Sequence, residues 1–226
     1  MPTNQADRGD TVAITPRTTL RRKRERGNYQ RELLDAVLDE ALVCHVGFVA
    51  DHGPVVLPMT FVRIGDNVYL HGAAGNDMLR HLAGDADVCV TVTLLDGLVF
   101  ARSAFHHSMN YRCVVLFGRA ERVTDLEELQ AMAAALLDHL APGRSHDARR
   151  PTPEELRATL ILRLPINEGS AKVRDSGPLD DDEDLDLPVW AGVLPMRLVA
   201  EPPVTHQGRR DSISVPKYIA ERVTRR

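Results

Sequence analysis

The order of hydrophobic and polar residues predicts one helix followed by a long series of strands. After Asn28, the apolar residues Leu33, Leu34, Val37 and Leu38 recur at helical spacing, so we expect an amphipathic helix over residues 29–40 with Asn28 as its cap. Beyond this segment the hydrophobic residues alternate with others, or form short apolar runs, as strands do. We expect strands at residues 42–50, 55–62, 67–71, 88–94, 98–104, 111–123 and 159–166.

The connections between these strands are short and rich in turn-forming residues. Residues 51–54, 64–67 and 96–97 contain the Asp, Asn, Gly and Pro that tight hairpins require. Neighbouring strands joined by hairpins run antiparallel, and an antiparallel sheet of this size tends to close into a barrel. The expected fold is therefore mainly β, an antiparallel barrel with peripheral helices.

Three further helices are expected around this barrel. A short one runs from Asn76 to residue 82, before Gly84. A longer one begins at Thr124, which forms a possible capping box with Glu127, and another begins with the box at residues 152–155.

The composition divides the chain into one body and two charged ends. Residues 1–27 form an N-terminal arm with a basic run at 21–26, which either stays solvated or docked on the body, or binds nucleic acid. Residues 28–200 form the barrel domain, and residues 175–188 within it form an acidic surface loop. Residues 201–226 form a charged tail.

Charge and cysteine content narrow the function classes. A formal net charge of −4 argues against a protein that mainly coats nucleic acid. The 3 cysteines are far apart and include no Cys-x-x-Cys pair, so we expect buried thiols in a reducing cytoplasm. No apolar run reaches the roughly 18 residues of a membrane span, and the acidic loop lacks the Gly and Glu of a calcium loop. We expect a cytoplasmic protein without membrane contact or bound metal.

Residues 105–112 hold the densest group of hydrogen-bond donors in the chain. Ser108, Asn110, Tyr111 and Arg112 stand there with two histidines and without an acidic residue, which favours an anion such as a phosphate ester. The guanidinium of Arg112 matches phosphate oxygens bidentately. His106 and His107 are adjacent, so on a strand they point to opposite faces and do not form a metal pair.

A second candidate half-site is the turn from His71 to Asn76. Its small residues, beginning with Gly72, let a ligand approach the backbone, and the following helix start offers amides to an anion. Antiparallel hairpins can bring residues 71 and 111 to the same rim of a barrel, so we expect one phosphate pocket built from both half-sites. Neither a Rossmann fingerprint nor a Walker loop occurs in the chain.

Taken in order, these segments resemble a known family. The segments are Pro58-Met59-Thr60, the turn at residues 69–72, the helix from Asn76, residues 107–112 and the Trp-Ala-Gly segment at 190–192. The chain is similar to the pyridoxamine 5′-phosphate oxidase-like, flavin-nucleotide-binding split-barrel family over roughly residues 15 to 200.

The resemblance implies a homodimer of split barrels with FMN at the subunit interface. It places the phosphate near Asn76, Asn110, Tyr111 and Arg112, and the isoalloxazine ring beside Pro58, Met59, Thr60 and His71. From the residues themselves, Ser108 and Gly72 are further cofactor-binding candidates, as a neutral contact and as a small residue of the turn. Lys172 and Trp190 approach from the partner chain or from the C-terminal cover. Asn76-Asp77 stands where many relatives have a basic residue after the His-Gly turn. FAD therefore stays an alternative to FMN as the cofactor.

Three function classes follow from these observations. The first is a flavin-dependent oxidoreductase that acts on an unidentified small molecule, with the cofactor performing the chemistry. The second is a carrier or sensor that binds flavin or haem without turnover. The third is a nucleic-acid-associated protein that uses the basic arm, although the overall charge disfavours it.

Overall fold

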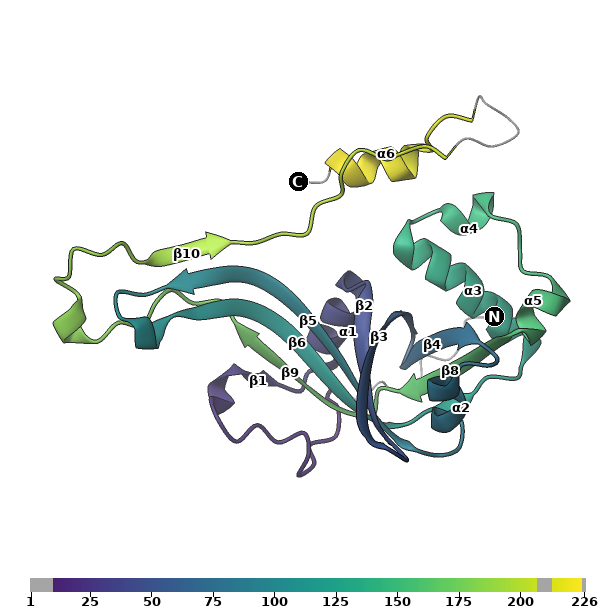
Figure 1. Ribbon diagram of the computed structural model, residues 1–226, viewed down its shortest axis with the longest axis horizontal. Coiled ribbons are helices and arrows are strands. Elements are labelled where there is room, and N and C mark those ends of the chain that lie inside the picture. Colours follow the sequence, from purple (N-terminus) through teal and green to yellow (C-terminus); the bar gives the residue numbers. More distant parts are fainter. Residues whose placement is uncertain (1–9, 207–212, 225–226) are drawn as a thin grey trace.

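The computed structural model describes residues 10–206 and 213–224, and these form one layered β structure with helices around it (Figure 1). The strands are β1 (Gly27–Asn28), β2 (Val43–Ala50), β3 (Gly53–Ile64), β4 (Asn67–Ala73), β5 (Asp87–Phe100), β6 (Ser108–Arg119), β7 (Glu121–Arg122), β8 (Thr159–Pro165), β9 (Glu168–Arg174) and β10 (Gly192–Pro195). The helices are α1 (Arg31–Glu40), α2 (Asp77–Leu82), α3 (Leu126–Leu140), α4 (Arg144–Asp147), α5 (Pro153–Arg157) and α6 (Lys217–Thr224), with short 3-10 turns η1 (Arg24–Arg26), η2 (Ala104–His106) and η3 (Asp182–Asp184).

All strands belong to a single antiparallel sheet. The order is β1-β9-β6-β5-β2-β3-β4-β8-β7, and β10 pairs with β5 beside this path. The sheet curls but does not close, because β1 and β7 do not pair with each other. This confirms the expected fold class, an antiparallel split barrel with peripheral helices.

The inner face of the curled sheet and helix α1 form the main core. Leu34, Val37 and Leu38 of α1 are fully buried, as the 3.6-residue period of the helix requires. They belong to one cluster with Val90 and Val92 of β5 and with inward residues of β2, β6 and β8. Helix α1 therefore fills the barrel.

A smaller core lies on the outer face, where α3 covers β4 and β8. Val62, Tyr69, Ile161 and Met132 are buried together there. The Tyr69 hydroxyl donates a hydrogen bond to Glu128 Oε1 of α3 at 2.8 Å. This helix covers one part of the outer face and leaves open the part formed by β2, β5 and the first half of β3.

Two helix caps differ from the prediction by a few residues. Helix α1 begins at Arg31 after Gln30, because the Asn28 side chain accepts instead from the Gln30 amide in a local turn. Helix α3 begins at Leu126, because Asp125, and not Thr124, accepts from the Glu128 amide at 2.8 Å. The capping box of α5, with Thr152 and Glu155, is confirmed.

The prediction of a turn at residues 96–97 is wrong. Strand β5 continues from Asp87 to Phe100 and pairs with β6 on both sides of this point, with a bulge between Leu95 and Gly97. The bulge leaves Asp96 without a partner in the β6 register and accommodates Gly97, where a Cβ would lie 3.1 Å from the Leu194 carbonyl oxygen of β10. The result is a long β5–β6 hairpin that reaches away from the barrel in Figure 1.

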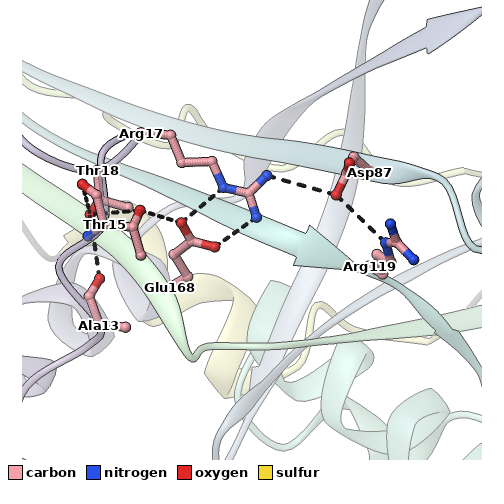
Figure 2. A network of polar contacts seen from close by, with 7 residues as sticks. All are labelled: Ala13, Thr15, Arg17, Thr18, Asp87, Arg119 and Glu168. Atoms are coloured by element: carbon pink, nitrogen blue, oxygen red, sulfur yellow. Dashed lines mark hydrogen bonds and ion pairs between the residues drawn. The ribbon is translucent and has the colours of Figure 1, made fainter.

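The described part of the N-terminal arm packs on the body. Val12 and Thr18 are buried, and Arg17 donates to both carboxylate oxygens of Glu168 at 2.8 and 2.6 Å (Figure 2). Arg17 also lies 5.1 Å from the centroid of the Phe117 ring and 3.7 Å from Asp87. The division at residues 27 and 200 stays a prediction, and residues 1–9 lie outside the described part.

At the other end of the chain, α6 packs beside α4. Tyr218 of α6 donates to Asp147 at 2.7 Å and accepts from Arg144 at 3.2 Å. The C-terminal segment thus runs from β10 along the hairpin back to the helical side of the molecule (Figure 1).

Candidate functional site

Strand β3 changes its partner at Thr60, and this creates an open strand edge. Its pairing with β2 reaches Val43↔Thr60, whereas its pairing with β4 starts at Phe61↔Leu70. Within the described residues, the other edge of β3 before Phe61 has no strand partner. The backbone polar groups on this edge, which includes Pro58, Met59 and Thr60, are available to a ligand.

The outer face of the sheet beside this edge is exposed. In β2, Cys44 and Val46 are fully buried, whereas the alternate residues Val43 and His45 face outward and are exposed. His45 pairs with Pro58 on one side and with Thr91 on the other. Valine, proline and threonine side chains thus form an open, largely uncharged face beside the split.

His71 lies at the border of this face, on β4. Its Nδ1 atom is buried and has no hydrogen-bond partner among the described residues. Burial lowers the pKa of His71 below its usual value, so the imidazole is neutral at physiological pH. A neutral ring with an unused lone pair can accept a hydrogen bond or ligate a metal.

Gly72 and Asn76 shape the turn after His71. A Cβ on Gly72 would lie 2.9 Å from Cδ1 of Leu79, so the residue allows α2 to pack closely on β4. The Asn76 side chain caps α2, accepting from the Leu79 amide at 3.1 Å. The side-chain oxygen of Asn76 is therefore already occupied by the cap of α2.

Arg112 is paired with two carboxylates. It donates to Asp96 at 3.0 and 2.8 Å and to Glu40 at 2.5 and 2.8 Å. The hydrogen bonds that Arg112 donates to Glu40 and Asp96 raise its pKa further above its usual value. In this chain its guanidinium is neutralised, which leaves little positive charge for a phosphate.

The other donors of this strand lie around a second arginine. Asn110 is 8% exposed, and its side-chain oxygen accepts from Arg174, a residue that the sequence prediction did not include. Tyr111 pairs with Arg174 in the sheet, and Lys172 pairs with Cys113 of β6 and with Gly27 of β1. Ser108 is exposed and begins β6.

Trp190 lies near the tip of the long hairpin. It is 67% exposed, and its ring centroid is 5.8 Å from that of Phe100. His107 packs edge-on against Phe100, while His106 lies 3.1 Å from Asp181. The acidic loop also contacts the tip of the hairpin, since Asp180 accepts a hydrogen bond from Arg102 at 2.8 Å.

The predicted site residues therefore fall into two groups. One group lies on β3, β4 and the turn before α2, and consists of Pro58, Met59, Thr60, His71, Gly72 and Asn76. The other lies on the hairpin, β9 and the C-terminal segment, and consists of Ser108, Asn110, Tyr111, Arg112, Lys172 and Trp190. In the sheet order, strands β5, β2 and β3 lie between β6 and β4, and the expectation that one chain brings the two half-sites to a single rim stays a prediction.

Sequence reasoning missed Arg174 and the two carboxylates that neutralise Arg112. Glu40 is 72 residues away from Arg112 and Asp96 is 16 residues away, so no local pattern links them. Arg174 ends β9, a strand that the sequence pattern did not predict, and only its burial distinguishes it from other arginines. Among the residues of known placement, no three His, Cys, Asp or Glu side chains gather as a metal site would require.

An unclosed antiparallel sheet, with a strand that changes partners at the split, defines a split-barrel protein. A family model described as pyridoxamine 5′-phosphate oxidase matches residues 30–173, and the chain therefore belongs to the pyridoxamine 5′-phosphate oxidase family. The family resemblance expected from the sequence is confirmed.

Two solved structures are similar over nearly the whole chain. The flavocytochrome Anf3 from Azotobacter vinelandii is 38% identical, with a TM-score of 0.87, and the match covers 93% of this chain and 98% of that one. The FAD and haem binding protein from Mycobacterium smegmatis is 37% identical, with a TM-score of 0.83, and the match covers 87% and 96%. No curated protein sequence matches the chain. No helix in the two described ranges has the length and apolar character needed to cross a membrane.

Proposed function

We propose that this protein binds a flavin and a haem and acts as an oxidoreductase on a small molecule. The observation that carries the proposal is its similarity, at 38% and 37% identity over most of the chain, to a flavocytochrome and to an FAD and haem binding protein. When bound, the two cofactors supply hydride and single-electron transfer. The residues of this chain bind them, orient them and exclude water.

The open edge of β3 fits the flavin ring. A flavin presents hydrogen-bonding groups along its pyrimidine side, which the free backbone groups near Met59 and Thr60 can pair. The exposed outer face next to Pro58 offers an apolar surface to the ring. We propose FAD in preference to FMN, because the Mycobacterium smegmatis relative is described as binding FAD.

A homodimer completes the proposed flavin site. The residues proposed for the flavin ring, Pro58, Met59 and Thr60 on β3, are called the ring group. In the sheet order, β2 and β5 lie between this ring group and the donor group on β6 and β9. Two copies that meet through the open face beside β3 can bring the ring group of one chain to the donor group of its partner. The exposed Val43 and Val56 on this face support such a contact, since exposed apolar patches mark interaction sites.

His71 is the residue that we propose as the haem iron ligand. Its imidazole is neutral, and Nδ1 has no hydrogen-bond partner among the described residues, so the ring would be free to offer a nitrogen lone pair to a haem iron. We expect His71→Ala to lose the Soret band of bound haem while the flavin fluorescence of the released cofactor remains. His52→Ala, in the exposed hairpin turn, is the matched control and keeps the band. An unchanged Soret band in His71→Ala would exclude this ligand.

The absorption spectrum of the purified protein tests the proposed function as a whole. We expect flavin and haem bands, FAD and haem in the mass spectrum of the released ligands, and bleaching of the flavin by NADH, NADPH or another reductant. Reoxidation by a candidate acceptor then identifies turnover. A colourless protein that takes up neither added flavin nor hemin would contradict the proposal, and a coloured protein that no donor reduces would favour a carrier or sensor.

A further inference from the structure

Arg174 is a buried cation without a carboxylate partner. The residue is 4% exposed, and its guanidinium donates to the Asn110 side chain and to the carbonyl oxygens of Ser176 and Gly177, both at 2.8 Å. All three acceptors are uncharged, and the Nε atom has no partner. A buried charge is costly unless an opposite charge compensates it. No carboxylate of the described residues hydrogen-bonds to Arg174, so its charge lacks a direct anionic partner.

The surroundings of Arg174 add positive charge. Strand β1 joins β9 through Gly27↔Lys172, which places the 3-10 turn η1 beside the end of β9. Burial, and then the nearby charge of Arg26, lower the pKa of Arg174 below its usual value. Tyr111 and Asp175 act on it in the opposite direction, but within the described ranges Asp175 forms no ion pair with it.

The rest of this basic region is also unneutralised. Arg21, Arg22, Lys23 and Arg24 are exposed, and Glu25 is the one acidic residue in their run. The placed residues form no ion pair with Arg26 or Lys172. Arg17, Arg63 and Arg163 differ from them, since each of these arginines is paired with one or two carboxylates.

We infer that Arg26, Lys172 and Arg174 bind the phosphate groups of the flavin, with the Tyr111 hydroxyl as a neutral donor. This assignment rests on the proposed flavin binding and moves the phosphate from Arg112, which Glu40 and Asp96 already neutralise, to the cluster at the end of β9. A phosphate or diphosphate supplies the missing charge and accepts from several N–H groups at once. The exposed basic residues before Arg26 extend the positive surface along which the adenylate part of FAD would lie.

Affinities for riboflavin, FMN and FAD test the assignment, because the first has no phosphate. Arg26→Ala removes one cation at a partly exposed position, so the fold is retained. We expect it to weaken the binding of FMN and FAD by about tenfold, as the loss of a charge-assisted hydrogen bond does, while riboflavin affinity stays unchanged. Lys172→Ala is a second variant with the same expected pattern. Quenching of flavin fluorescence on titration measures all three affinities.

Arg119→Ala is the matched control. It removes the same charge from an exposed arginine that pairs with Asp85 at the other end of β6, and we expect no change with any flavin. Equal losses for riboflavin and FMN in Arg26→Ala and Lys172→Ala, or no loss for either, would overturn the assignment. A loss specific to the phosphorylated flavins in Arg112→Ala alone would return the phosphate to Arg112. If the unmodified protein binds none of the three flavins, the proposed function itself fails.

Discussion

Tyr69 connects the sheet to helix α3 through a buried hydroxyl. The residue is 5% exposed, and its hydroxyl donates to Glu128, which also accepts from Arg163 at 3.1 Å. Burial, and then the contact with Glu128, raise the pKa of Tyr69 from 10.0 to about 12. The folded protein thus keeps a proton that the unfolded chain releases earlier.

The difference between the pKa of Tyr69 in the folded and in the unfolded protein predicts that Tyr69 makes stability depend on pH. Its contribution is complete below pH 10 and is lost as the pH rises toward 12, because the raised pKa favours the folded state only while the hydroxyl is protonated. Urea unfolding at several pH values is expected to show a steeper fall of the free energy of unfolding in the parent protein than in Tyr69→Phe. The buried Cys44, whose pKa burial raises to about 12, contributes equally to both proteins. Equal slopes would contradict the prediction.

Two arginines show how far the site could be read from residue types. Arg112 has the chemistry of a phosphate ligand, and Arg174 has the same chemistry at the end of a neighbouring strand. Their roles differ because Glu40 and Asp96 reach Arg112, whereas Arg174 meets only neutral oxygens. Carboxylates from other helices and strands determine how much positive charge an arginine offers to a ligand. The spacing of residues along the chain does not predict which carboxylates will reach it.

Helix α3 starts where a side chain accepts a hydrogen bond from one of its first backbone amides. Asp125 accepts from the Glu128 amide, and no such bond forms at Thr124. Asp125→Ala is expected to lower the free energy of unfolding by about 1 kcal/mol, measured by urea denaturation. Thr124→Ala is the control and should leave it nearly unchanged. The opposite order of the two variants would restore the cap expected from the sequence.

Strand periodicity predicted most of the sheet, and its failure at residues 96–97 has a local cause. The alternation of buried Val88, Val90 and Val92 identified β5, and the turns after β2 and β3 followed from their Gly and Asp residues. Asp-Gly is also a hairpin sequence, but here the Gly97 position accepts a bulge and the close approach of β10. The Asp-Gly dipeptide is compatible with a hairpin turn and with a β-bulge, and its pairing with β6 and β10 determines which of the two forms.

At the scale of the whole molecule, the two groups of proposed flavin contacts lie on strands that are not neighbours in the sheet, and this arrangement supports the proposed dimer. The ring group lies on β3, and the phosphate cluster lies on β9 and η1, with β2, β5 and β6 between them in the sheet order. We propose that a second copy supplies one of the two groups to each flavin. Oligomeric state and flavin affinity should therefore change together.

Val56→Lys tests this coupling on the open face. Val56 is 64% exposed in the single chain and pairs with Gly47 of β2, so a lysine there leaves the core intact but places a charge in the proposed interface. In sedimentation analysis we expect a dimer for the parent protein and a monomer for the variant, with a loss of flavin affinity on the order of tenfold or more. Leu126→Lys, at a 57% exposed position of α3, should change neither quantity. A parent protein that binds flavin tightly as a monomer would show that one chain completes the site, and the phosphate cluster would then have to be reached around the edge of its own sheet.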